Sequence, residues 1–169
     1  MGEGRAGEMT LRLSAPEPLA SAHRVDEFDC GEARLNSWLM RRALANQATG
    51  ASRTFVVVDQ DNAVCGYYAL VAGAVAHAAA TSPIRRNMPD PLPVMVLARL
   101  AVAQRAQGIK LGAALLQDAV NRAVTVSQST GVRALLVNAL NERAKRFYEH
   151  YGFQVSPIDA MILMLRVTA

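Results

Sequence analysis

The sequence predicts an α/β fold in which a mixed sheet is flanked by helices. Residues 54–72 have the pattern of two strands joined by a short turn, and residues 94–140 have the pattern strand, helix, strand. A short turn makes neighbouring strands antiparallel, whereas a helical crossover makes them parallel. A helix and a last strand complete the chain, and this order of elements predicts one mixed sheet covered by helices.

The first half of the chain opens with a short expected strand at residues 11–13. Apolar residues then recur at helical spacing and predict a helix over residues 32–47, ended by residues 50–53. Residues 54–58 and 64–72 are rich in β-forming residues and flank a turn at 59–62, so we expect a hairpin there.

The second half begins with a loop or short irregular element at residues 81–93, which contain four prolines. The apolar run at 94–102 predicts a central strand, interrupted by Arg99. A helix over 111–127, a strand over 132–140, a helix over 141–151 and a strand over 161–167 follow. Asn141 is placed to cap its helix, Gly152 to end it and Phe153 to pack back on it.

Composition indicates a globular chain that acts in the cytoplasm. Its 169 residues are 51% hydrophobic and 19% charged, enough for one domain over residues 11–169 after a flexible arm at 1–10. The longest apolar run is broken by glycines, and we expect no membrane span. The scattered cysteines and histidines show no metal-ligand spacing, so no metal site is expected.

The turn around Gly108 and Gly112 is the clearest functional signal. It joins an apolar strand to an amphipathic helix that starts near Leu111. The unpaired N–H groups of a helix start favour an anion, and glycine lets that anion approach the backbone. The pattern therefore predicts a phosphate or pyrophosphate site.

Two motifs resemble those of the GNAT acetyltransferase superfamily. The acetyl-CoA pyrophosphate motif, Gln/Arg-x-x-Gly-x-Gly/Ala, matches residues 107–112 with Lys110 in place of the middle glycine, or residues 105–110 if Arg105 is taken as its start. The motif Asn-x-x-Ala-x-x-Phe-Tyr-x-x-x-Gly-Phe is complete from Asn141 to Phe153. The resemblance implies a mostly antiparallel sheet of about six to seven strands with about four helices, and acetyl-CoA as the acyl donor.

A narrower resemblance is to the GNAT toxins of bacterial toxin–antitoxin modules, which acetylate the α-amino group of aminoacyl-tRNA. It rests on five segments in order: Phe28-Asp-Cys-Gly31, Leu35-Asn-Ser-Trp-Leu39, Ser52-Arg-Thr-Phe-Val56, residues 85–94 and residues 97–102. It implies a ribbon-helix-helix DNA-binding antitoxin and a homodimer as partners, and arrested translation as the consequence.

The resemblance also implies a set of site residues. Tyr148 would be the catalytic acid that protonates the departing CoA thiolate. The cofactor would contact Leu100, Ala101, Val102, Gln107, Gly108, Ile109, Lys110, Leu111, Gly112 and Asn141. The tRNA phosphates would contact Arg85 and Arg86, with Arg41 and Arg42 as a weaker extension.

Several alternatives stay open at this point. Tyr148 falls on the buried stripe of its helix and is also readable as a core residue, and Asn141 as a cap alone. Paired arginines on a loop or helix are commonly just solvated. Lys110 either adds a cation for phosphates or crowds the backbone.

No carboxylate stands out as a general base, which favours an acceptor that is already largely neutral, such as the α-amine of an aminoacyl ester. The alternatives to an aminoacyl-tRNA acetyltransferase are a GNAT enzyme for a small amine or a protein N-terminus, and a degenerate GNAT protein that serves as an antitoxin-binding co-repressor.

Overall fold

The computed structural model describes residues 11–168, so the arm expected at residues 1–10 lies outside the described residues. The chain divides into two compact units. One contains the residues up to Tyr67 together with Ala101–Leu115, and the other contains Tyr68–Leu100 and the residues from Leu116 onward.

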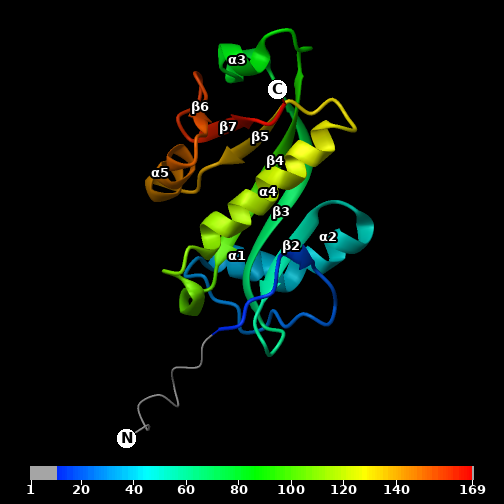
Figure 1. Cartoon of the computed structure of the whole chain (residues 1–169), viewed down its shortest axis with the longest axis vertical. Coiled ribbons are helices and arrows are strands. Elements are labelled where there is room, and N and C mark those ends of the chain that lie inside the picture. The colour runs from blue at the N-terminus through cyan, green and yellow to red at the C-terminus, as the bar shows by residue number, and fades with distance from the viewer. Residues whose placement is uncertain (1–10, 169) are drawn as a thin grey trace, which may run out of the picture. The chain divides into compact units, whose positions relative to one another are not determined.

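The strands form a mixed sheet of seven strands in the order β1-β2-β3-β4-β5-β7-β6 (Figure 1). β4 and β5 are parallel, and the pairs β1–β2, β5–β7 and β6–β7 are antiparallel. The mixed sheet predicted from the sequence is therefore confirmed. The strands are β1 (Glu17–Pro18), β2 (Arg53–Val58), β3 (Val64–Val75), β4 (Leu92–Val102), β5 (Ala134–Asn138), β6 (Gln154–Val155) and β7 (Ile162–Arg166).

The helices follow the predicted pattern, with additions. The first helical run contains α1 (Ala33–Trp38), a π-helical segment (Leu39–Ala43) and α2 (Leu44–Thr49), and left-handed Gly50 ends it. The proline-rich segment contains the short helix α3 (Ser82–Arg85). α4 (Leu111–Ser127) has the predicted bounds, and α5 (Glu142–His150) lies within the predicted range.

The core of the first unit is built around Tyr67 on β3. Its ring stacks on Trp38 with centroids 5.9 Å apart and meets the edge of Phe28 at 5.5 Å. The Tyr67 hydroxyl donates a hydrogen bond to the Leu35 carbonyl oxygen at 2.8 Å. A buried phenol needs such a partner, and this bond ties α1 to β3.

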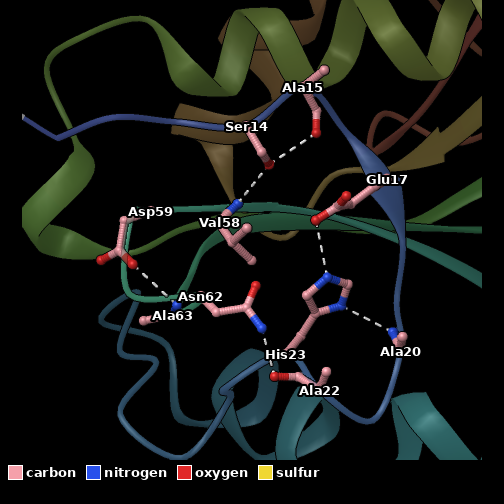
Figure 2. Close-up of polar contacts among 10 residues, drawn as sticks. All are labelled: Ser14, Ala15, Glu17, Ala20, Ala22, His23, Val58, Asp59, Asn62 and Ala63. Atoms are coloured by element: carbon pink, nitrogen blue, oxygen red, sulfur yellow. Dashed lines mark hydrogen bonds and ion pairs between the residues drawn. The ribbon is translucent and has the colours of Figure 1, made fainter.

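The strand expected at residues 11–13 is wrong, because pairing with β2 starts later, at β1. The Ser14 N–H donates to the Val58 carbonyl, but the Val58 N–H donates to the Ser14 hydroxyl at 3.1 Å rather than to a backbone carbonyl (Figure 2). A side chain that intercepts the backbone in this way competes with ladder formation.

A histidine fixes the loop that follows β1. His23 Nδ1 accepts a hydrogen bond from the Ala20 N–H at 2.9 Å, and Nε2 lies 3.0 Å from the Glu17 carboxylate (Figure 2). Because Nδ1 is an acceptor, Nε2 carries the proton and donates it to Glu17. The Asn62 amide donates to the Ala22 carbonyl at 2.7 Å and joins this loop to the β2–β3 turn.

The second unit has its own polar contact beneath α4. The buried Tyr68 hydroxyl donates to the Asp118 carboxylate, and Arg122 Nε lies 2.8 Å from the Tyr68 oxygen and 3.0 Å from that carboxylate. Burial first, and then the Asp118 charge, raise the pKa of Tyr68 far above its ordinary value. The phenol therefore stays protonated and holds α4 against β3.

Candidate active site

The loop that precedes α4 contains two left-handed residues. Gly108 has φ 85° and Lys110 has φ 63°, and α4 begins at Leu111 directly after them. The Ala114 N–H donates to the Lys110 carbonyl at 3.2 Å, which is the first hydrogen bond of the helix. The N–H groups of residues 111–113 consequently have no partner within the helix and point toward its N-terminal side. This is the geometry of an anion-binding turn.

The structure explains why the family motif has glycine at these places. A Cβ on Gly108 would meet no atom within 4 Å, so the space beside this backbone is open to a ligand. Lys110 adopts the same left-handed region with a side chain, at a strain of about 1–2 kcal/mol. Its side chain is exposed, so the backbone of the loop remains accessible.

A network of hydrogen bonds ties this loop to Asp29 and Cys30, which precede α1, and to the end of β4. Gln107 Nε2 donates to the Val102 carbonyl at 3.0 Å and to the Cys30 carbonyl at 3.4 Å. The Gln104 N–H donates to the Asp29 carbonyl at 2.8 Å. The side chain of Gln107, expected at the cofactor, is thus engaged within the loop.

Asp29 anchors that network. One of its carboxylate oxygens accepts from the Gly31 N–H at 2.9 Å and from the Asn36 amide at 3.0 Å. The Gly31 bond first, and then the Asn36 bond, lower the pKa of Asp29. Sequence reasoning assigned no role to Asp29 or Asn36, although an Asp two residues before Gly is a turn signature. The toxin-like segments 28–31 and 35–39 therefore shape the loop.

Arg105, the alternative start of the pyrophosphate motif, is paired with a carboxylate of the protein. Its guanidinium lies 2.9 Å from the carboxylate of Asp59, whose side chain is 6% exposed. Burial alone would raise the pKa of Asp59, but hydrogen bonds from Ala63 and Asp61, together with Arg105, lower it below its usual value. This ion pair fixes the start of the loop to the β2–β3 turn.

The last residues of β4 extend past the part of the strand that pairs with β5. The parallel register pairs Val94–Leu97 with Ala134–Val137, whereas β4 continues to Val102. Leu100, Ala101 and Val102 belong to this extension, where the sequence predicts backbone contacts to the cofactor and to the thioester oxygen. That role stays a prediction.

Tyr148 on α5 is buried with an unengaged hydroxyl. Its side chain is 8% exposed, and its ring packs against Phe147 and Phe153 at centroid distances of 5.3 and 5.5 Å. Within residues 11–168 no hydrogen bond reaches its hydroxyl, although the oxygen is not among the fully buried unpartnered atoms. Burial raises its pKa to about 12, so Tyr148 is protonated at neutral pH. A pure core role would call for a satisfied hydroxyl.

Asn141 caps α5 as predicted, because its side-chain oxygen accepts from the Ala144 N–H at 2.9 Å. Phe153 packs back on the helix as expected, and left-handed Gly152 precedes it. Tyr151 is 43% exposed and contacts Phe147 and His150 at the end of the helix. A direct contact of Asn141 with a cofactor stays a prediction.

The four candidate tRNA-binding arginines lie on two elements. Arg85 and Arg86 are at the end of α3, and Arg86 is exposed. Arg41 and Arg42 are exposed on the π-helical segment of the other unit. None of the four ion pairs found among residues 11–168 involves any of these arginines. Their charges are therefore available to a polyanion.

Neither a metal site nor a membrane-spanning helix is found among the described residues. Over residues 11–168 no three His, Cys, Asp or Glu side chains gather in a way that could hold a metal ion. In the same residues no helix has the length and apolar character to cross a membrane.

Comparison with known proteins identifies the class to which this fold and loop belong. The family "Acetyltransferase (GNAT) domain" matches residues 51–155, a range that includes β2, the loop before α4 and the helix of Tyr148. The chain belongs to this family of acetyltransferases.

A more specific likeness is to a tRNA-acetylating toxin of Mycobacterium tuberculosis (strain ATCC 25618 / H37Rv). The two sequences are 49% identical over 152 residues, which are 90% of this chain and 91% of that protein.

Solved structures add two complexes. AtaT complexed with acetyl-methionyl-tRNAfMet is 28% identical, with a TM-score of 0.85 over 92% of this chain and 95% of that one. A tyrosine-to-phenylalanine variant of AtaT, bound to the C-terminus of the antitoxin AtaR and acetyl-CoA, is 28% identical, with a TM-score of 0.78 over 92% of this chain and 94% of that one.

Proposed function

We propose that this protein transfers the acetyl group of acetyl-CoA to the α-amino group of an aminoacyl-tRNA and thereby blocks translation. The observation that carries the choice of acceptor is the 49% identity to a tRNA-acetylating toxin over nine-tenths of the chain. The loop before α4 and the unengaged Tyr148 hydroxyl are consistent with the reaction.

In this proposal the loop holds the donor. The free N–H groups of residues 111–113 and the open side of Gly108 receive the pyrophosphate, and Lys110 adds a cation at the same loop. Ile109 and Leu111 place their backbone in the turn, and Gly112 continues it into the first turn of α4. The extension of β4 offers backbone N–H groups to the pantetheine arm and the thioester oxygen.

Tyr148 serves as the acid. The α-amine attacks the thioester carbonyl carbon, a C–N bond forms, the C–S bond breaks, and the amine loses a proton to solvent. The thiolate, with an ordinary pKa of about 8.5, takes the proton of the phenol, and the phenolate then regains a proton from solvent. A phenol with a pKa of about 12 is fully protonated before the step, as an acid must be.

No carboxylate stands out in the sequence as a general base, and this fits the α-amine of an aminoacyl ester as the acceptor. An α-amine has an ordinary pKa near 8, whereas a lysine ε-amine has one near 10.4 and needs a base to remove its proton. A sequence in which no carboxylate stands out as a general base therefore fits the first amine better than the second.

We further propose the biological setting. Residues 11–169 act as one catalytic domain in the cytoplasm, the protein forms a homodimer, and its partner is a ribbon-helix-helix DNA-binding antitoxin that covers the active site. The AtaT structure with the C-terminus of AtaR supports an antitoxin partner of this general kind.

One assay tests the function directly. We expect purified protein with labelled acetyl-CoA and charged tRNA to put label on the aminoacyl group, and deacylated tRNA to take none. Label found on polyamines or peptide N-termini, and not on aminoacyl-tRNA, would contradict the proposal. Absence of acetyl-CoA binding at high micromolar concentration by calorimetry would favour the non-catalytic co-repressor instead.

A further inference from the structure

Arg133, next to the start of β5, holds three carbonyl groups of α3 and its end. Its Nε donates to the Ile84 carbonyl at 2.9 Å, and its Nη2 donates to the carbonyls of Pro83 at 3.2 Å and Arg86 at 3.4 Å. The remaining nitrogen, Nη1, donates to the Thr168 hydroxyl at 3.1 Å. Only a planar guanidinium spans acceptors arranged in this way.

Arg166, on β7, reaches the same helix. Its Nη1 donates to the Pro83 carbonyl at 3.2 Å, and its Nε donates to the Thr168 carbonyl at 2.8 Å. Two guanidinium groups from separate segments therefore share one carbonyl oxygen. We call Arg133 and Arg166 the arginine clamp.

The clamp concentrates positive charge beside Arg85 and Arg86. Neither clamp residue takes part in an ion pair found among residues 11–168. Burial first, and then the nearby Arg166 charge, lower the pKa of Arg133, as expected for two like charges that share the Pro83 carbonyl. Four arginines in one region with only neutral acceptors favour an anionic ligand.

The clamp also supplies order that α3 lacks by itself. A helix of four residues has too few internal hydrogen bonds to be stable alone. Its free carbonyls are the groups that the clamp binds, and the residues at the end of this helix are Arg85 and Arg86. The direction in which these two arginines project thus depends on Arg133 and Arg166.

We propose that Arg133 and Arg166 are positioning residues for the nucleic-acid substrate: by binding the carbonyls of α3 they hold Arg85 and Arg86 in place to contact phosphates of the aminoacyl-tRNA. This inference rests on the proposed function and deepens it. The clamp acts through α3, and the chemistry of acetyl transfer does not involve it.

The diagnostic variant is Arg133→Lys, which keeps the charge but has no planar fork for three carbonyls. We expect the KM for aminoacyl-tRNA to rise about tenfold, the loss typical of one charge-assisted contact. The kcat and the KM for acetyl-CoA stay unchanged. The slope of log affinity against log salt falls in magnitude by about 0.7, the value for one single-strand phosphate contact, and by about twice that in the R85A/R86A double variant.

Matched variants separate the outcomes. Arg24→Lys is the control and leaves every parameter unchanged, because Arg24 is an exposed arginine of the other unit whose one ion pair within residues 11–168 is with Glu27. If Arg133→Lys does not fold, Arg166→Lys replaces it, because Arg133 still holds α3 in that variant.

Two outcomes would overturn the positioning role of Arg133 and Arg166. A wild-type KM in Arg133→Lys would overturn the inference, because charge alone would then suffice. A joint loss of melting temperature, acetyl-CoA affinity and kcat would overturn it too, because the clamp would then be a general structural element. If the wild-type protein itself does not acetylate aminoacyl-tRNA, the proposed function fails and the inference falls with it, and that result is visible before any variant is made.

Discussion

Replacement of Lys110 separates its two effects on the loop. Lys110→Gly removes the left-handed strain of about 1–2 kcal/mol. Glycine also raises the conformational entropy of the unfolded chain, which lowers the free energy of unfolding by about 0.5–1 kcal/mol. The net gain in the free energy of unfolding is therefore about 1 kcal/mol. For a chain of this length that raises the melting temperature by about 2–4 °C.

The same variant loses a cation at the proposed pyrophosphate site. One charge-assisted contact is worth about 1.5 kcal/mol, so the Kd for acetyl-CoA rises about tenfold, and less at high salt. Lys110→Ala is the matched control: it loses the cation and keeps a Cβ in the left-handed region, so the affinity falls and the melting temperature stays within about 1 °C.

Differential scanning calorimetry and titration calorimetry on the three proteins measure both quantities. A Lys110→Gly variant that binds acetyl-CoA more tightly than wild type would refute the reasoning, because the lysine would then obstruct the loop. An unchanged melting temperature would refute the strain argument alone.

Three further predictions follow from single contacts. Gly66→Ala puts a Cβ 2.8 Å from a Leu115 methyl group and lowers the free energy of unfolding by about 1–3 kcal/mol in denaturant titrations, whereas Gly131→Ala, in open space, is near neutral; equal losses would contradict this. Tyr148→Phe lowers kcat with little change in acetyl-CoA affinity. In the wild type we expect the phenol of Tyr148 to titrate near pH 12 in absorbance measurements. This residue should then cause no loss of rate between about pH 9 and 11, roughly the range in which an ordinary tyrosine ionises. A loss of rate in that range that disappears in Tyr148→Phe would contradict the raised pKa. Because the pKa of Asp59 is lowered in the fold, its stabilisation is present above about pH 4 and is lost as the pH falls through the folded pKa; the stability difference between wild type and Asp59→Asn should narrow there, and a constant difference would count against the ion pair.

Local signals predicted the parts of the fold that depend on nearby residues. The bounds of α4 follow from an unbroken apolar periodicity after a glycine turn, and the cap at Asn141 needs only a partner three residues away. The two-residue strands β1 and β6 carry no periodicity, since a strand of that length is defined by its neighbour in the sheet. Neither strand was therefore predicted from the sequence.

In the candidate site, too, local features were predicted and long-range contacts were not. The motifs located the turn before α4 and Tyr148. No spacing rule predicts that Asp29 supports the loop, or that Arg133 bonds to Ile84 in α3, 49 residues earlier in the sequence. These contacts depend on tertiary structure. Lys110 is the intermediate case: the sequence marked it as a departure from glycine, and the structure gives the left-handed backbone as the physical reason that glycine is usual there.

The extension of β4 beyond Leu97 has a consequence for how this protein should be mapped. The contacts proposed for Leu100, Ala101 and Val102 in that stretch use the main chain, because these three side chains carry no hydrogen-bonding group. Alanine scanning leaves the main chain intact, so it would return near-normal proteins at Leu100 and Val102 and the region would look dispensable. Replacement by proline, which removes a single N–H, or a backbone ester at the same position would expose it. A residue-by-residue catalogue of side-chain effects therefore undercounts this surface.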